Sequence, residues 1–515
     1  MSLRAQKMIR ANFYLIAILG LTTACQKSDD APAKSVARVF HQLDKPVTAD
    51  NYLNGKAFCE EYKEITSKEY GRFVSVPVDY SSPGEGSLDI YAWTERPFNP
   101  ELPTVVMVDG GPGQNTHDFG DSLNSDWNEI HFDQRGLGCS SLGTFEKYKD
   151  PKYFSTANTV RDMDEIRKAY NIKKWSVFGV SYGTVPATEY GSQYSKHTVA
   201  VTLEGTLYSV EDVHSTDWRV AKWNLILSKL TTAQVKSFGK VLAHKSYQEL
   251  ILLLFTERIY ADNGFTKVLT DLKKLISTDG VIDYALLDKA AESAMNQIDK
   301  DNSGPHARFA QKPLGVDSQI FSVIFCKDLG YELLTTGPDY DFENNQFVVR
   351  SYKTSSTCKK MGINSSQQRV YTASDYPVSV PISYFQGSHD GATLARGAFK
   401  HYRYVPKGIA NFILNKKGGH NPLSLSVVDL ERHGREKQSK DSMDAHRELF
   451  AKTLRGEKIK EWDLTSPNFL RSLSTENLGL WTLIDYSQDG KNEFEKQLEG
   501  IRQNPRSQPN LLIEP

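Results

Sequence analysis

The chain has 515 residues, with 62 Lys and Arg against 63 Asp and Glu and a formal net charge of −1. This balance excludes the strong basic excess typical of nucleic-acid-binding proteins, and no Cys or His spacing suits a zinc site. Hydrophobic residues make up 39% of the chain and aromatic residues 11%, which is enough for a packed core in a chain longer than one ordinary domain. We expect neither a metal nor a cofactor.

Residues 1–24 have the pattern of a secretory signal peptide. Their charged residues are all basic: Arg4, Lys7 and Arg10. The apolar run that follows, 13–21, is too short for a convincing membrane span. Cys25 then follows Ala24, as in a bacterial lipobox, where the cysteine is lipidated. Thr22 stands where that pattern usually has Leu, so plain cleavage after Ala24 is the alternative. We expect an exported protein that is periplasmic, anchored to the outer membrane or secreted, with residues 25–50 as a polar tether.

The first part of a core, residues 51–206, contains strand patterns that alternate with helical ones. Alternating residues at 73–78 and 87–93 flank a Gly-rich turn and predict an antiparallel hairpin. Further segments follow in order, with strands at 104–108, 127–133, 175–178 and 199–203 and a helix at 159–170. This order predicts an α/β fold with a mostly parallel central sheet flanked by helices.

Residues 175–190 predict a nucleophile elbow. An apolar strand runs into Gly179-Val180-Ser181-Tyr182-Gly183, and a helix-compatible segment follows. Strand, Gly-x-Ser-x-Gly and helix in that order hold a serine on a strained turn with its hydroxyl exposed. Side chains in place of Gly179 and Gly183 would collide with the neighbouring backbone. We therefore take Ser181 as the candidate nucleophile.

The alternation stops after this first part. Residues 207–375 are predicted to form an inserted α-helical cap, with helices at 217–230, 232–243, 246–260, 266–277 and 284–298. A cap suits an enzyme that excludes water from its substrate, and structural bulk is the alternative. The core resumes at 376–455, and residues 456–515 are expected to form a C-terminal extension without chemistry of its own.

The resumed core supplies candidates for an acid and a base. A strand pattern at 380–386 runs into Gly387-Ser388-His389-Asp390, and a later strand at 409–415 leads to Gly418-Gly419-His420. Ser181, Asp390 and His420 follow the chain order of the α/β-hydrolase triad. In a triad, the histidine takes the proton from the serine and the acid orients the imidazole.

Several motifs together resemble one branch of the α/β-hydrolases. D-G-G-P-G follows one strand and D-Q-R-G-x-G the next, N-T-x-x-D-x-x-x-x-R spans 158–167, and the elbow reads G-x-S-Y-G. This set is similar to the prolyl aminopeptidase and tripeptidyl aminopeptidase branch, over roughly two-fifths of the chain. The resemblance implies an aminopeptidase. That branch usually has His where Asp109 stands here, which bears on the hydrogen bonding behind the loop.

The glycine-rich loop 110–113 has a physical role in acyl transfer, because negative charge develops on the substrate's carbonyl oxygen. Two backbone N–H groups aimed at that oxygen stabilise it. One is expected from Tyr182, directly after the nucleophile, and the other from Gly110 or Gly111.

Glu204 follows the strand at 199–203, at the sheet edge where active sites lie. Three interpretations are open. In the first, Glu204 binds the free α-ammonium group of a substrate, as an aminopeptidase requires. In the second, it replaces the triad acid. In the third, it is a helix-cap or ion-pair residue.

Four cysteines besides Cys25 suit an oxidising compartment. They allow three pairings, and we favour Cys326 with Cys358, both within the insertion, which leaves Cys59 for Cys139. Buried free thiols are the alternative.

The residues therefore predict an exported serine hydrolase that works through an acyl-enzyme, and the resemblance implies an aminopeptidase of the proline iminopeptidase or tripeptidyl aminopeptidase type, which releases N-terminal residues from peptides. A carboxylesterase with the same triad is the alternative enzyme, and a catalytically silent surface protein of the same fold is the alternative outside enzymes. The expected partner is a peptide or small ester, with no nucleic acid, and a membrane only through the lipid anchor. The sequence sets neither the preferred residue nor the oligomeric state.

Overall fold

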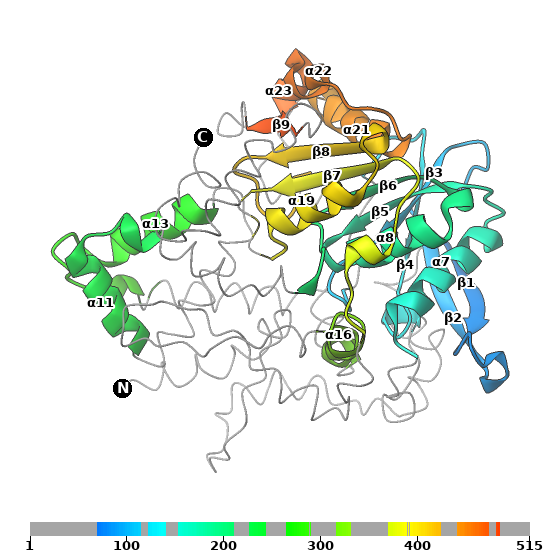
Figure 1. Ribbon diagram of the computed structural model, residues 1–515, viewed down its shortest axis with the longest axis horizontal. Helices are drawn as coiled ribbons and strands as arrows, with labels where there is room; N and C mark the ends of the chain where they lie inside the picture. The colour runs from blue at the N-terminus through cyan, green and yellow to red at the C-terminus, as the bar shows by residue number, and fades with distance from the viewer. Residues whose placement is uncertain are drawn as a thin grey trace, which may run out of the picture.

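The computed structural model describes residues 69–114, 122–140, 153–210, 226–243, 264–287, 289, 316–330, 369–388, 390, 392–423, 440–472 and 480–484. Within these residues, nine strands form one sheet in the order β1-β2-β4-β3-β5-β6-β7-β8-β9 (Figure 1). The middle of the sheet, from β4 to β8, is parallel. Antiparallel pairs join β1 to β2, β2 to β4 and β8 to β9. The predicted α/β class with a mostly parallel sheet is confirmed, as is the hairpin.

The strands are β1 (Tyr70–Pro77), β2 (Ser87–Thr94), β3 (Thr104–Val108), β4 (Asn128–Phe132), β5 (Trp175–Val180), β6 (Thr198–Glu204), β7 (Ile382–Gly387), β8 (Ala410–Asn415) and β9 (Trp481–Leu483). The α-helices are α7 (Thr156–Ala169), α8 (Thr184–Gln193), α11 (Thr232–Ala243), α13 (Gly264–Leu275), α16 (Val316–Lys327), α19 (Ala395–Tyr404), α21 (Lys440–Leu454), α22 (Glu461–Thr465) and α23 (Pro467–Ser472). No helix among the described residues has the length and apolar character needed to cross a membrane.

The central strands are buried on both faces. Successive side chains of a strand point to opposite faces, so Val106 and Val108 of β3 lie in one apolar cluster and Val105 and Met107 in another. Helices α7, α8, α16 and α19 contribute to the first cluster. Helices α21, α22 and α23 contribute to the second, in which Phe450 packs edge-on against Phe178. Two-sided burial explains the continuous apolar runs in the sequence.

The long segment between β6 and β7 is an insertion between neighbouring strands, because Val201 of β6 pairs with Ile382 of β7. Within it, α11 and α13 lie apart from the sheet (Figure 1), and Gln234 Nε2 of α11 donates to the Ile276 carbonyl just after α13 at 2.8 Å. Both correspond to predicted helices. The other three predicted helices of the insertion fall mostly or wholly outside the described residues.

Helix α16 also belongs to the insertion but packs differently. Its buried residues Ile320, Val323 and Ile324 lie in the same cluster as the core strands. This helix was not predicted. Part of the expected cap is therefore an integral layer of the core.

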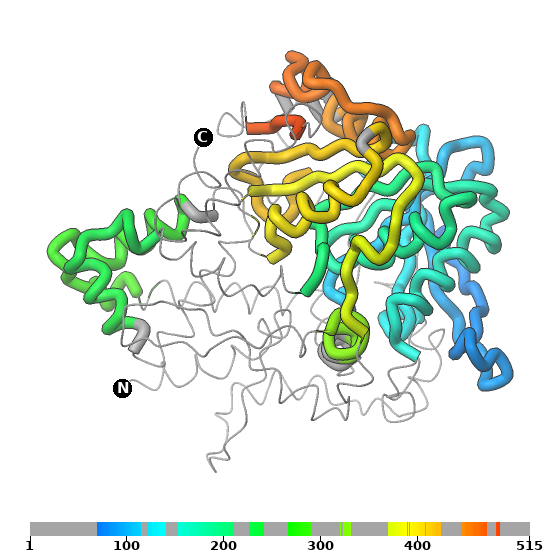
Figure 2. The backbone as a smooth tube through the Cα atoms, in the orientation of Figure 1, coloured from blue at the N-terminus to red at the C-terminus, as the bar shows by residue number. Residues whose placement is uncertain are grey.

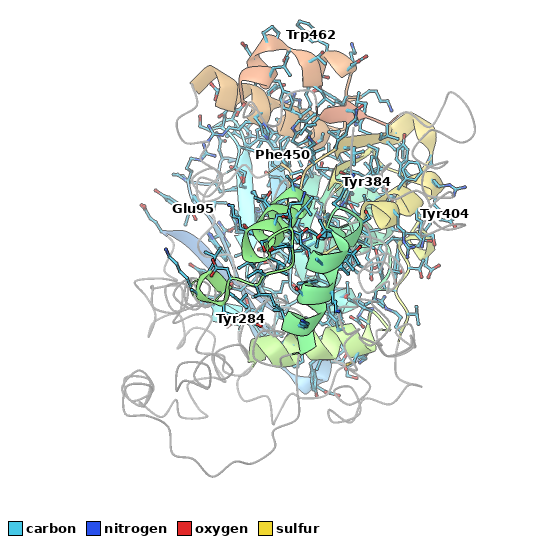
Figure 3. The ribbon with its side chains drawn as sticks, turned by 90° about the vertical axis from the view of Figure 1, so that its left-hand side faces the viewer. Glu95, Tyr284, Tyr384, Tyr404, Phe450 and Trp462 are labelled. Atoms are coloured by element: carbon cyan, nitrogen blue, oxygen red, sulfur yellow. The ribbon has the colours of Figure 1, made fainter. Side chains whose placement is uncertain are left out.

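The core also continues past residue 455, the end predicted for it from the sequence. Strand β9, red in Figure 2, extends the sheet by pairing with β8. Leu483 lies opposite Ile413 in this pairing. Buried Phe469 of α23 and Trp481 of β9 join the second cluster, whereas Trp462 of α22 lies at the outer edge of the molecule (Figure 3). Helix α23 and strand β9 thus supply packing, because these apolar groups cover one face of the sheet.

Candidate active site

The turn after β5 has the geometry of a nucleophile elbow. Ser181 has a φ of 55°, a left-handed conformation that is costly for a residue with a side chain. Residues Ser181–Gly183 form a short 3-10 turn, and α8 begins at Thr184. The Thr184 hydroxyl donates to the Ser181 carbonyl at 2.6 Å. The predicted succession of strand, strained turn and helix is confirmed.

The two glycines of the elbow are required by close backbone approaches. A Cβ atom at Gly179 would lie 2.4 Å from the Gly183 carbonyl oxygen. A Cβ atom at Gly183 would lie 2.0 Å from the carbonyl oxygen of Val108, at the end of β3. The collisions expected from the motif therefore exist, and they explain why the turn admits glycine at both positions.

The structure brings the predicted acid and base into contact. Asp390 follows β7 and His420 follows β8, at the carboxyl edge of the sheet where Ser181 follows β5. His420 Nδ1 lies 2.9 Å from Asp390 Oδ2. Asp390 is fully buried and His420 is 8% exposed. Because the carboxylate accepts the Nδ1 proton, Nε2 is the imidazole nitrogen that can take a proton from a nucleophile.

The Asp390 carboxylate has a complete set of hydrogen-bond donors. Its Oδ1 accepts the N–H groups of Ala392 and Thr393 at 2.8 and 2.9 Å. Its Oδ2 accepts the Thr393 hydroxyl at 2.8 Å and Gln386 Nε2 at 3.1 Å. Burial alone would raise the pKa of Asp390, but the charge and hydrogen bond of His420 and the bonds from Thr393 lower that pKa below its ordinary value. Asp390 is therefore held as a carboxylate.

Two carboxylates act on the His420 imidazole. Burial lowers the pKa of His420, but the charge and hydrogen bond of Asp390, together with the charge of Glu204, raise that pKa above its ordinary value. The imidazolium form is thus stabilised, as a general base requires once it has accepted a proton.

The glycine-rich loop after β3 lies against the nucleophile. A Cβ atom at Gly110 would be 3.0 Å from Cβ of Ser181. Gln134, from the D-Q-R-G motif, donates its Nε2 to the Asp109 carbonyl at 3.2 Å. The D-Q-R-G motif therefore holds the glycine-rich loop through the main chain of Asp109, the residue that stands in place of the usual His. Gly111, the other candidate oxyanion donor of this loop, follows directly.

The side chain of Tyr182 reaches a polar network that the sequence did not reveal. Its hydroxyl is 2.9 Å from the Thr156 hydroxyl at the start of α7, and burial raises the pKa of Tyr182. Asp328, just after α16, accepts the Thr156 N–H at 2.5 Å. Nearby, Arg369 donates to Glu189 of α8 at 2.8 Å. Residues of the insertion thus contact the elements that carry the elbow.

The D-Q-R-G and N-T-x-x-D motifs meet in a buried ion pair. Arg135 donates from Nε and one terminal nitrogen to the two Asp162 oxygens at 2.7 and 2.6 Å. Tyr80 donates its hydroxyl to the same carboxylate at 2.8 Å. These motif residues join the loop after β4 to α7, and their role is structural.

Glu204 ends β6 and is almost fully buried. Its Oε1 accepts the Leu423 N–H at 2.6 Å.

Within the described residues, no group of three or more His, Cys, Asp and Glu side chains is arranged to hold a metal ion.

Cys139 and Cys326 are both disulfide-bonded, which removes the free-thiol alternative for these two. Cys25, Cys59 and Cys358 lie outside the described residues, so lipidation and the pairing stay predictions.

Comparison with known proteins agrees with this architecture. Residues 103–257 match the family model of the alpha/beta hydrolase fold. A proline iminopeptidase of Aspergillus aculeatus is 28% identical over 201 residues, 34% of this chain and 40% of that protein. A proline iminopeptidase of Xylella fastidiosa is 32% identical over 115 residues, 22% of this chain and 34% of that protein. A probable 1-acylglycerol-3-phosphate O-acyltransferase of Oryza sativa is 32% identical over 119 residues, 22% of this chain and 28% of that protein.

The sheet order, the elbow and the match of residues 103–257 show that the chain has the α/β-hydrolase fold. Within that class, the sequence is similar to the proline iminopeptidases, which confirms the resemblance predicted from the motifs. The chain spans about two-fifths or less of the length of these relatives.

Proposed function

We propose that the protein is a serine hydrolase in which Ser181 is the nucleophile, His420 the general base and Asp390 the orienting acid. The observation that carries this proposal is the buried 2.9 Å hydrogen bond between His420 Nδ1 and Asp390, at the sheet edge where Ser181 occupies a strained turn. A serine on a strained turn, together with a histidine paired to a carboxylate, is typical of acyl transfer.

The reaction follows from these positions. Ser181 Oγ attacks the substrate's carbonyl carbon while His420 Nε2 takes the hydroxyl proton. Negative charge on the carbonyl oxygen is stabilised by the N–H groups of Tyr182 and of Gly110 or Gly111. His420 then donates its proton to the leaving group, which departs and leaves an acyl-enzyme. Water, activated by the same imidazole, releases the acid and restores Ser181.

A fluorophosphonate probe tests the nucleophile directly, because it reacts covalently with activated serines. We expect labelling of the wild type at Ser181 and no labelling of Ser181→Ala. The substitution Ser87→Ala, at an exposed serine at the start of β2, is the matched control and should label normally. We expect Ser181→Ala to lose ~10⁴- to 10⁶-fold in kcat. Wild-type turnover by this variant would contradict the mechanism.

The similarity to proline iminopeptidases favours an aminopeptidase that removes N-terminal residues. The rice relative bears the name of an acyltransferase. Similarity over the matched region therefore does not by itself determine the activity. Aminoacyl-arylamides with free and with blocked amino groups, beside a simple aryl ester, separate the cases. An aminopeptidase cleaves the free-amine arylamides and leaves the blocked ones. Cleavage of the ester alone would favour the carboxylesterase.

We also propose that the protein is exported and lipidated at Cys25, with the inserted helices covering the site. Disulfides at Cys139 and Cys326 support an oxidising compartment. Metabolic labelling with a radioactive fatty acid should mark the wild type and leave Cys25→Ala unmarked, and the variant should move from the membrane to the soluble fraction. Labelling of both forms would contradict lipidation at this residue.

A further inference from the structure

The chain leaves β6 for the insertion through four consecutive residues. These residues contact all three triad members or the residues that hold them in place. We call them the β6 turn: Glu204, Gly205, Thr206 and Leu207. Glu204 lies beside Val180, directly before the nucleophile, in the pairing of β6 with β5. The turn is therefore at the centre of the carboxyl edge of the sheet.

Two of these residues contact the loop that carries His420. The Glu204 carboxylate, 4% exposed, accepts the Leu423 N–H at 2.6 Å, three residues beyond the histidine. The carbonyl of Leu423 accepts His446 Nε2 at 2.9 Å, so the end of the loop is held from both sides. Gly205 has a φ of 58°, and a Cβ atom there would lie 2.9 Å from Cε1 of His420. The main chain of the turn is thus packed directly on the imidazole.

The other two residues reach the acid and the nucleophile. The Thr206 N–H donates to Gln386 Oε1 at 3.1 Å, and Gln386 Nε2 donates to Asp390 at 3.1 Å. The Leu207 N–H donates to the Thr184 hydroxyl at 3.0 Å, which in turn donates to the Ser181 carbonyl. One short turn therefore contacts the base, the acid and the nucleophile, or the residues that hold them.

We propose that Glu204 is a positioning residue for His420, holding the 418–423 loop through Leu423 N–H and placing a second negative charge beside the imidazole. This inference rests on the proposed triad. It differs from the interpretation of Glu204 as an anchor for a substrate's amino group, because a carboxylate that accepts a main-chain N–H away from solvent already has a structural task. Positioning acts on every substrate, whereas an anchor acts on substrates with a free amine.

Charge and position can be separated by substitution. Glu204→Gln keeps an oxygen that accepts the Leu423 N–H but removes the charge. Glu204→Asp keeps the charge but is one methylene too short to reach Leu423 unchanged. Glu101→Gln, at an exposed residue of the loop before β3, is the matched control for the loss of one negative charge.

The pH dependence of kcat/KM is measured with a simple aryl ester that has no amine. The described carboxylates that act on His420 are Asp390 and Glu204, so Glu204→Gln should move the acidic limb of the profile to lower pH. Glu204→Asp should leave that limb near its wild-type position and lower kcat roughly 10- to 100-fold with little change in KM, because displacements of about 1 Å cost on that order. Glu101→Gln should match the wild type in both respects.

The outcomes are distinguishable. An unchanged ester profile in Glu204→Gln, with a raised KM only for free-amine arylamides, would overturn positioning in favour of the anchor. Wild-type kcat on the ester in Glu204→Asp would also overturn it. A wild-type protein that neither reacts with the fluorophosphonate nor cleaves any substrate would overturn the proposed function and this inference with it. Should Glu204→Gln fold poorly, Glu204→Asp provides the test by itself.

Discussion

At the scale of single residues, His420 sets the pH dependence of the proposed reaction. The base must be neutral to accept a proton, and the pKa of His420 is raised above the ordinary imidazole value of 6.5. We therefore expect kcat/KM to rise with pH, with the midpoint of the acidic limb above 6.5. Initial rates on an aryl ester across the pH range measure it. A profile that is flat from about pH 5 to 8 would argue against a histidine base.

Sequence and structure agree at this scale wherever the chemistry is local. Gly179, Ser181 and Gly183 lie within five residues, so the sequence alone predicts the turn they form. The positions of Asp390 and His420 directly after strand patterns predict that both lie at the same sheet edge as Ser181. The contact of Glu204 with Leu423 joins residues 219 apart, and no local pattern predicts which of several buried carboxylates meets which N–H group.

At the scale of elements, the pair of Arg135 and Asp162 connects β4 to α7, and both side chains are almost fully buried. Removing one partner leaves the other charge buried, which typically costs about 3–5 kcal/mol. We expect Asp162→Asn to lower the free energy of unfolding by that order, measured by urea denaturation. Asp126→Asn, at an exposed residue before β4, is the control. Equal stability of the two variants would show that the pair contributes nothing net.

Helix α16 and strand β9 could not be predicted from the sequence. Its core, Ile320 to Cys326, is a short run of mostly apolar residues, and such a run fits a buried strand and a buried helix equally well. Strand β9 has three residues, too few for an alternating pattern. Both elements acquire their structure from the surfaces on which they pack.

The second prediction for elements concerns the disulfide of Cys326, in α16. Pairing with Cys358 would close a loop of about 33 residues, and chain-entropy arithmetic gives roughly 3–4 kcal/mol of stabilisation. Mass spectrometry of an unreduced digest should recover a peptide that joins these two cysteines. We expect Cys358→Ser to lower the melting temperature. A peptide that joins Cys326 to Cys59 or Cys139 would refute the pairing.

At the scale of the whole molecule, two structural facts describe how the site is assembled. Ser181, Asp390 and His420 follow the parallel strands β5, β7 and β8, and the insertion contributes α16 to the same core. Residues far apart in the chain therefore support one another, as when Ser176 of β5 donates its hydroxyl to the Leu454 carbonyl at the end of α21. The candidate site therefore forms only when the strands that carry its residues have assembled into the sheet.

The pairing of β6 with β7 has a consequence for the order of folding. Strands β1 to β6 form from one continuous stretch, but Val201 meets Ile382 only after a very long loop has closed. Contacts of such sequence separation form slowly, although lengthening the loop adds little to the equilibrium cost, about 0.6 kcal/mol for each doubling. We expect refolding in two phases, in which β-sheet signal recovers before Ser181 becomes reactive to the fluorophosphonate. A growing polypeptide would therefore carry its nucleophile for much of its synthesis without the base that activates it.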